Sequence, residues 1–257
     1  GRGGAAFRRL AVEPLEARTL MAVIGHSDLA GVAALPQATM DAIGQQTWFF
    51  THASVGGNMM AGMSALHSSD PTRYQLGRTS VGYDSDAGRA DDAPATTTEG
   101  TIYDCSRGNP GWSSKLTIFA NSLSLADWHD AKVDVVMNKL CYIDQNADVN
   151  GYLNSMSNLA ATYPGTQMVY MTIPLTNDSD NDNVLRNNFN TAVREYCVAN
   201  NRLLFDIADM EAHTPSGEEV TFSYAGQTYQ RLYDGYTDDG GHLNAAGQER
   251  VALGWYA

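Results

Sequence analysis

The stretch FFTHASVGGNMM, residues 49–60, decides how this chain folds. The segment 47–50 (TWFF) is aromatic and predicts a buried strand, whereas residues 57–67 carry apolar side chains at helical spacing. Ser54 lies between them, and the two glycines that follow it let backbone and substrate approach closely. A serine on a tight turn from strand to helix has an exposed hydroxyl, and the backbone N–H groups at the start of the helix point at a developing oxyanion. The stretch is typical of a nucleophilic serine, although an ordinary helix-capping serine has the same neighbours.

The rest of the chain alternates between strand-like and helix-like segments, which favours a parallel sheet covered by helices. Further strands are predicted within residues 132–144, 165–175 and 202–211, helices over 112–125, 151–162, 184–201 and from Asn244, surface loops over 84–99 and 176–183, and a hairpin over 219–233. We therefore expect a three-layer α/β/α sandwich with a parallel sheet of about five strands, similar to flavodoxin. One domain over 45–257, preceded by a lead-in over 23–44, is the simplest organisation.

A second polar stretch, DDGGHLN at residues 238–244, carries the other half of the predicted chemistry. Asp239 and His242 lie three residues apart across two glycines, just before a predicted helix. A carboxylate in this position can fold back onto its own histidine, fix the imidazole tautomer and stabilise the imidazolium. The other ring nitrogen can then accept the proton of Ser54. A lone Asp-x-x-His is also found in polar turns, so the prediction depends on the serine turn.

Composition excludes several classes of function. A formal net charge of −13 in 257 residues argues against binding to a nucleic-acid backbone. No apolar run approaches the ~18 residues of a membrane-spanning helix. The three cysteines, Cys105, Cys141 and Cys197, show no metal-binding spacing, and buried free thiols are expected. We expect neither a metal nor an organic cofactor.

The two stretches together resemble the SGNH (GDSL-type) hydrolase family, from about residue 45 to the end. The resemblance implies a nucleophile at Ser54, in a divergent first block of the form H-x-SVG-N. It also implies a general base at His242, oriented by the Asp239 carboxylate, in a last block that continues as HLNAAG. It also implies an oxyanion hole made by the Ser54 amide and by a second-block glycine in SRGNPGWSSK (106–115). Gly108 is the better candidate for that glycine, and Gly111 is the second.

Two departures from the family pattern matter. His52 and Ala53 precede the serine where the family has Gly-Asp. The third block of the family ends in Gly-x-Asn-Asp, and its asparagine donates to the oxyanion. Here the run NKLCYID (138–144) aligns Ile143 with that asparagine. The sequence therefore leaves the third donor open: it is Asn58, Lys139, or absent.

The N-terminal run RRLAVEPLEARTLMA (8–22) resembles a motif, LEPLE-R-LL, that begins many exported or surface proteins of some bacteria. It implies that residues 1–22 are a targeting element and that the protein is secreted or held at a bacterial cell surface. A short amphipathic helix beginning near Pro14 is the alternative interpretation.

The expected function is hydrolysis of carboxylic esters through an acyl-serine intermediate, on a small-molecule or polysaccharide substrate such as a carbohydrate acetyl ester. Two alternatives stay open. One is a lipase-like or thioesterase-like acyl hydrolase, and the other is a catalytically silent carbohydrate-binding or surface module on the same fold. The oligomeric state is not predicted.

Overall fold

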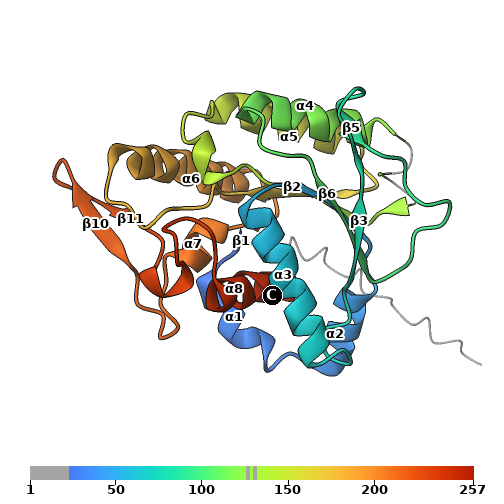
Figure 1. The fold of residues 1–257 in the computed structure, drawn as a ribbon, viewed down its shortest axis with the longest axis horizontal. Helices are drawn as coiled ribbons and strands as arrows, with labels where there is room; N and C mark the ends of the chain where they lie inside the picture. The colour runs from blue at the N-terminus through green and yellow to red at the C-terminus, as the bar shows by residue number, and fades with distance from the viewer. Residues whose placement is uncertain (1–22, 126–127, 130–131) are drawn as a thin grey trace, which may run out of the picture.

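The structure is a computed structural model that describes residues 23–125, 128–129 and 132–257 (Figure 1). The export motif predicted over residues 8–22 lies outside the described residues and stays a prediction. At the centre is a seven-stranded sheet in which every neighbouring pair of strands is parallel. In spatial order its strands are β1 (Val23–Ile24), β9 (Leu204–Phe205), β8 (Gln167–Met171), β7 (Val135–Asn138), β2 (Trp48–His52), β6 (Thr101–Ser106) and β3 (Gly77–Val81).

The predicted fold class is confirmed. The five inner strands follow the order of flavodoxin-like folds, with β2 as the first strand and β6, β7, β8 and β9 as the second to fifth. The expected five strands are extended by the edge strands β1 and β3. Neither edge strand nor β6 was predicted from the sequence.

Helices cover both faces of the sheet (Figure 1). The first face carries α4 (Trp112–Leu123), α5 (Val149–Thr162) and α6 (Asn181–Ala199), and the second carries α1 (His26–Val32), α2 (Gln37–Gly44), α3 (Val55–Ser69), α7 (Ile207–Glu211) and α8 (Ala245–Ala252). Smaller elements are β4 (Tyr83–Asp84) with β5 (Arg89–Ala90) and the predicted hairpin of β10 (Thr221–Tyr224) and β11 (Gln227–Gln230). The 3-10 helices η2 (Tyr142–Asp144), η3 (Asp234–Tyr236) and η4 (Leu253–Trp255) are also short. No helix in the described ranges is both long and apolar enough to cross a bilayer.

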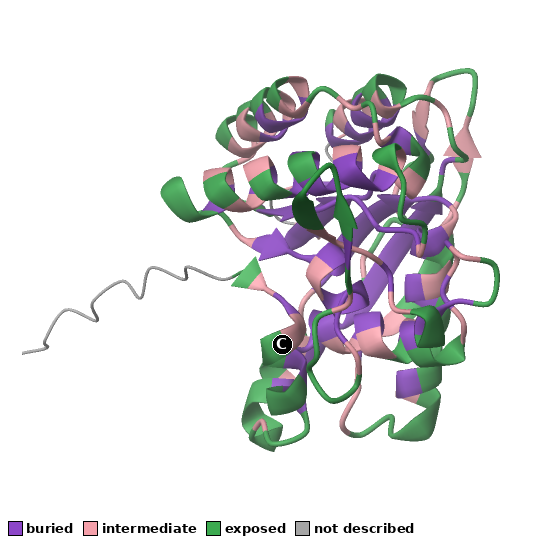
Figure 2. Cartoon of the chain, turned by 90° about the vertical axis from the view of Figure 1, so that its left-hand side faces the viewer, coloured by how far each residue is buried: buried purple, intermediate pink, exposed green. Residues whose placement is uncertain are grey.

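Strand β2 is buried on both faces, which explains its continuous aromatic sequence. Phe49 packs into the core under α4, α5 and α6, while Trp48 and Phe50 pack into the core on the opposite face. Figure 2 shows the strands buried between helices whose outer surfaces are exposed. Burial of each such aromatic side chain contributes about 1.5–3 kcal/mol, so both layers hold this strand in place.

The packed fold includes residues 23–44, which the sequence reading set apart as a lead-in. Strand β1 pairs with β9 at the sheet edge. Leu29, Val32 and Met40 are buried in the same core as Phe50. The three side chains recur on the inner faces of two short helices, so this segment covers apolar surface that α3 and α8 leave open.

Two predicted strands are shorter than expected, because polar side chains turn the backbone. The run 132–144 leaves the sheet at Asn138 and turns into η2, where the Asp144 carboxylate accepts the Cys141 N–H at 2.7 Å. Similarly, the run 202–211 forms β9 and then α7, whose N-terminus is capped by the Asp206 side chain. In both places the turn moves side chains to the carboxyl edge of the sheet.

Close packing of α3 against α8 requires a glycine at position 62. A Cβ atom on Gly62 would lie 2.2 Å from the carbonyl oxygen of Gln248 in α8. By contrast, a Cβ atom on Gly57 in the same helix meets nothing within 4 Å. The two helices that flank the serine turn and the histidine loop are therefore in backbone contact.

This contact predicts opposite effects of one substitution at two positions. Gly62→Ala should lower the free energy of unfolding by about 1–3 kcal/mol, because the helices must move apart. Gly57→Ala should raise it by up to about 1 kcal/mol, because alanine is the better helix former. Urea denaturation of both variants measures this, and equal effects at the two positions would contradict the packing described.

A buried carboxylate in α7 predicts a pH dependence of stability. Burial raises the pKa of Glu211 from 4.5 to about 8, although the Leu175 N–H donates to it at 2.9 Å. The unfolded chain releases this proton at lower pH than the folded chain. The contribution of protonated Glu211 to the free energy of unfolding is therefore complete below pH 4.5. It is lost as pH rises towards about 8, by at most about 1.4 kcal/mol per pH unit.

Glu211→Gln keeps an acceptor for Leu175 and removes the titration. The stability of the wild type minus that of Glu211→Gln, from urea denaturation at pH 5, 6, 7 and 8, should fall as pH rises. Taking the difference cancels other titrating groups, such as His52, whose pKa burial lowers. Glu218→Gln, on an exposed loop, is the control and should give a flat difference. A flat difference for Glu211→Gln would disprove the buried, protonated carboxyl.

Candidate active site

Ser54 lies on the turn between β2 and α3 in a backbone conformation that serine rarely adopts. Its φ and ψ are 55° and −118°, and it occupies the N-cap position of α3 without making a side-chain cap. A non-glycine residue with these angles stores about 1–3 kcal/mol of strain and persists only where the surroundings impose it. The conformation points the hydroxyl away from the helix end, which leaves the first N–H groups of α3 unoccupied by that side chain.

The structure brings the three predicted residues together in a chain of hydrogen bonds. Ser54 Oγ lies 2.7 Å from His242 Nε2, and His242 Nδ1 lies 2.8 Å from Asp239 Oδ2. A carboxylate only accepts, so Nδ1 carries the ring proton and Nε2 accepts from the serine hydroxyl. The arrangement can move the serine proton onto the imidazole while the carboxylate stabilises the resulting charge.

Backbone amides keep Asp239 ionised. Its Oδ1 accepts the N–H of Gly241 at 3.0 Å and that of His242 at 2.8 Å. These donors, with the imidazole, hold the pKa of Asp239 far below its usual range. The side chains of His242 and Asp239 are 43% and 57% exposed, so the site opens to solvent. The carboxylate is thus available to orient the histidine at every pH near neutrality.

The loop that carries His242 is fixed to its surroundings at both ends. Asn58 in α3 accepts the Leu243 N–H through Oδ1 at 3.2 Å, which ties the loop to the helix that begins after the serine. Asn244 caps α8 by accepting two amides, and its Nδ2 donates to Asp238 at 3.2 Å. Asp238 is thereby turned away from the histidine that Asp239 orients.

The loops after β6 and β7 continue the backbone pairing of the sheet beside Ser54. The Arg107 N–H donates to the carbonyl of His52 and the Lys139 N–H to that of Thr51, both at 3.0 Å. The buried guanidinium of Arg107 joins the two loops, because it donates to Asn138 Oδ1 at 2.9 Å and to the carbonyls of Lys139 and Gly108. Ligands of flavodoxin-like folds bind at this edge, next to the first and third strands.

Of the predicted oxyanion donors, Gly108 lies where a glycine is needed. It follows β6 at the carboxyl edge of the sheet with φ of +73°, is exposed, and has open space around its Cβ position. Gly111 instead caps the N-terminus of α4 with φ of −56°. The assignment of Gly108 and the Ser54 amide to an oxyanion hole stays a prediction.

The candidates for the third donor have other contacts. Lys139 is fully buried, and its ammonium group contacts the carbonyls of Ala53 and Leu140 and the Cys141 sulfur. Ile143 is 50% exposed and offers only carbon atoms. Asn58 uses its side-chain oxygen on Leu243, as described above, and its amide nitrogen is still able to donate, so this candidate stays a prediction.

Tyr142, which the sequence analysis did not single out, lies against the serine and the histidine. Its hydroxyl is close enough to Ser54 to affect the pKa of the tyrosine. Its ring meets the His242 ring edge-on, with centroids 5.6 Å apart. The signal in the sequence was its place in the third block, one residue before the position aligned with the family asparagine.

His52, which departs from the family pattern, belongs to a buried network below the serine. Its Nε2 lies 3.0 Å from Asp104 Oδ2, and Arg78 donates to both oxygens of the same carboxylate. This network also gives a structural reason for Gly56. A Cβ atom there would lie 2.4 Å from the His52 Cβ, so the glycine makes room for the histidine.

One cluster of metal-ligand side chains occurs among the described residues, formed by His26, Asp209 and His213. The rings of His26 and His213 stack at 3.4 Å, tilted by only 8°, and both Nδ1 atoms contact Asp209. A histidine binds a metal ion in the plane of its ring. An ion in the plane of one of these stacked rings lies far out of the plane of the other, so both rings cannot bind it. We therefore assign the cluster to joining α1 to α7.

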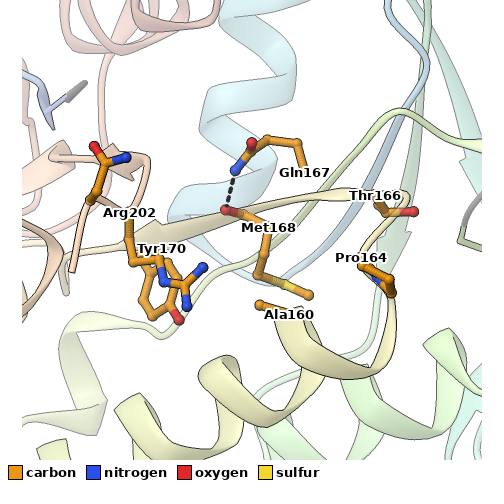
Figure 3. A pocket seen from close by; sticks show the side chains of 8 residues that line it. Ala160, Pro164, Thr166, Gln167, Met168, Tyr170 and Arg202 are labelled. Carbon is orange, nitrogen blue, oxygen red and sulfur yellow. Dashed lines mark hydrogen bonds between the residues drawn. The ribbon is translucent and has the colours of Figure 1, made fainter. Parts of the chain in front are cut away.

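Another pocket lies at the opposite edge of the sheet (Figure 3). It encloses about 290 Å³ beside the amino end of β8 and is lined by Gln167, Tyr170 and Arg202 among others. The Gln167 amide donates to the Met168 carbonyl, as the dashed line shows. The pocket lacks a nucleophile paired with a base, so the candidate active site remains the edge that carries Ser54.

No family model and no curated protein matches the sequence. Solved structures of several bacterial proteins are similar to it in fold. A GDSL-like lipase from Bacteroides thetaiotaomicron is 11% identical, with 90% of this chain and 95% of that chain covered and a TM-score of 0.47. A catalytic mutant of an acetylxylan esterase from Geobacillus stearothermophilus is 12% identical, with 81% and 91% covered and a TM-score of 0.47. Phospholipase A1 from Streptomyces albidoflavus is 12% identical, with 82% and 98% covered and a TM-score of 0.39.

The strained turn predicts that glycine is better tolerated than alanine at position 54. Both substitutions remove the hydroxyl, but glycine also releases the backbone strain of about 1–3 kcal/mol. This release exceeds the chain-entropy cost of glycine, which is about 0.5–1 kcal/mol. Ser54→Gly should therefore show a higher free energy of unfolding than Ser54→Ala in urea denaturation. The reverse order would mean that the backbone at this turn is relaxed.

Proposed function

We propose that the protein is a serine hydrolase that cleaves carboxylic esters through an acyl-serine intermediate. The observation that carries the proposal is the hydrogen-bonded chain from Ser54 through His242 to Asp239, at the carboxyl end of the first inner strand. Ser54 is held on a strained turn that directs its hydroxyl to the base.

In the first step Ser54 Oγ attacks the ester carbonyl carbon while its proton passes to His242 Nε2. The carbonyl electrons move to oxygen, and the Ser54 amide and the Gly108 N–H are the proposed donors to the resulting oxyanion. When the tetrahedral intermediate collapses, the imidazolium gives its proton to the leaving alcohol. Water then repeats the sequence on the acyl-serine, with His242 as the base, and releases the carboxylic acid.

A water-soluble ester is the substrate class that the exposure of the site favours. The side chains of His242 and Asp239 are 43% and 57% exposed, so a bulky alcohol such as a polysaccharide can approach. We therefore propose acetyl or similarly short esters of carbohydrate, in preference to the long acyl chains of a lipase or thioesterase. The resemblance of residues 8–22 to an export motif supports an action outside the cytoplasm, and this too is a proposal.

The triad predicts large and specific losses of activity. His242→Ala should lower kcat for p-nitrophenyl acetate by about 10⁴-fold or more, and Asp239→Asn should cost as much or somewhat less. Ser54→Ala should abolish both turnover and covalent labelling by a fluorophosphonate probe. Circular dichroism checks that each variant is folded.

Matched controls are available next to each residue. Asp238→Asn changes the neighbouring carboxylate, which contacts Asn244, and Ser27→Ala changes an exposed serine beside another histidine. Both should leave the esterase rate within a few-fold of wild type. If Ser54→Ala still labels and still turns over ester, the serine mechanism is wrong. A wild-type protein that neither labels nor hydrolyses any ester would favour the silent carbohydrate-binding module instead.

A further inference from the structure

The site lacks the side chain from which related hydrolases draw their third oxyanion donor. Ile143 stands at that position, and it has no polar atom. The ammonium group of Lys139 is turned into the interior, where carbonyls and a sulfur occupy it. A donor from the loop after β7 must therefore come from another of its residues.

Tyr142 is such a residue. It opens η2, which follows the strand that pairs with β2, and it is half-buried. Its hydroxyl is close enough to Ser54 to interact with it. Its ring and the His242 ring meet edge to face, with centroids 5.6 Å apart. The side chain thus lies beside both the proposed nucleophile and its base.

The ring is held in place before any substrate arrives. Arg186 in α6 donates through Nε to the Tyr142 carbonyl at 2.6 Å, and its guanidinium carbon lies 5.9 Å from the ring centroid. On the opposite side the ring packs against Gly241, where a Cβ atom would lie 3.0 Å from Cε1. A side chain at position 241 would displace the ring, so the glycine beside His242 serves the tyrosine.

The backbone that carries Tyr142 is equally fixed. The Asp144 carboxylate accepts the Cys141 N–H at 2.7 Å and the buried ammonium group of Lys115. A donor held by such contacts costs no reorganisation during the reaction, which is the condition for strong oxyanion stabilisation. Burial and the nearby charge of Asp239 raise the pKa of Tyr142, so its hydroxyl keeps its proton near neutrality.

We infer that the Tyr142 hydroxyl is an oxyanion donor of this site and takes the place of the missing asparagine; the inference rests on the proposed function. As Ser54 Oγ bonds to the carbonyl carbon, the π electrons move to the carbonyl oxygen and the serine proton moves to His242. Tyr142 directs its O–H to the developing oxyanion. It donates a hydrogen bond and transfers no proton, so it is unchanged at the end of each step.

Tyr142→Phe tests the inference, because it keeps the ring and removes only the hydroxyl. It should lower kcat for p-nitrophenyl acetate by about 10²–10³-fold, the usual effect of losing one oxyanion donor, with KM changed by less than about 3-fold. A boronic acid that forms a tetrahedral adduct with Ser54 should bind more weakly by a similar factor. A residue that only packs against His242 would leave both quantities unchanged, since phenylalanine packs in the same way.

Tyr224→Phe, on the exposed strand β10, is the matched control and should show wild-type kinetics. Thermal unfolding verifies that both variants are folded. If the wild type turns over ester and the kcat of Tyr142→Phe is within about 3-fold of the wild-type value, the inference is wrong and the serine mechanism stands. Absence of turnover and of Ser54 labelling in the wild type would instead overturn the proposed function, and the inference with it.

Discussion

The carboxyl end of β2 is the constraint on which the rest of the site depends. Backbone hydrogen bonds from Arg107 and Lys139 extend the pairing of β2 one step beyond its neighbouring strands on both sides. The strand therefore cannot relax sideways, and the chain must turn within one residue to enter α3. Ser54 takes the strained conformation because both β2 and α3 are fixed by buried apolar side chains. Two hydrophobic layers thus impose the orientation of one hydroxyl group.

Polar groups buried beneath this edge hold the loops in position. Arg107, Lys115 and Lys139 are each at most 2% exposed, and burying a cation without partners costs several kcal/mol. Carbonyl oxygens, Asn138 and the Asp144 carboxylate satisfy most of their donors. These contacts connect the loop after β6 with the loop after β7. An apolar core of the same volume would leave the two loops without a fixed register.

Local patterns made part of this site predictable from the sequence. Ser54 stands between a strand and a helix that its neighbours predict, and Asp239 contacts His242 three residues away. Contacts between residues far apart in the sequence could not be predicted in this way. Strand β6 was missed because its Asp104 is polar in a buried strand, and its ion pairs with His52 and Arg78 come from two other strands. Tyr142 was missed because η2 turns it, and not Ile143, towards a serine 88 positions earlier in the chain.

The backbone contact between α3 and α8 has a consequence for synthesis. Ser54 lies near the start of the fold, and His242, 188 residues later, lies near the end of the described chain. A ribosome that has released the chain as far as β8 has already delivered β2, the serine turn and α3, but neither His242 nor the helix that packs on Gly62. Until then Ser54 has no histidine beside it. The contact between Ser54 and His242 therefore forms late, together with the closure of one face of the sheet.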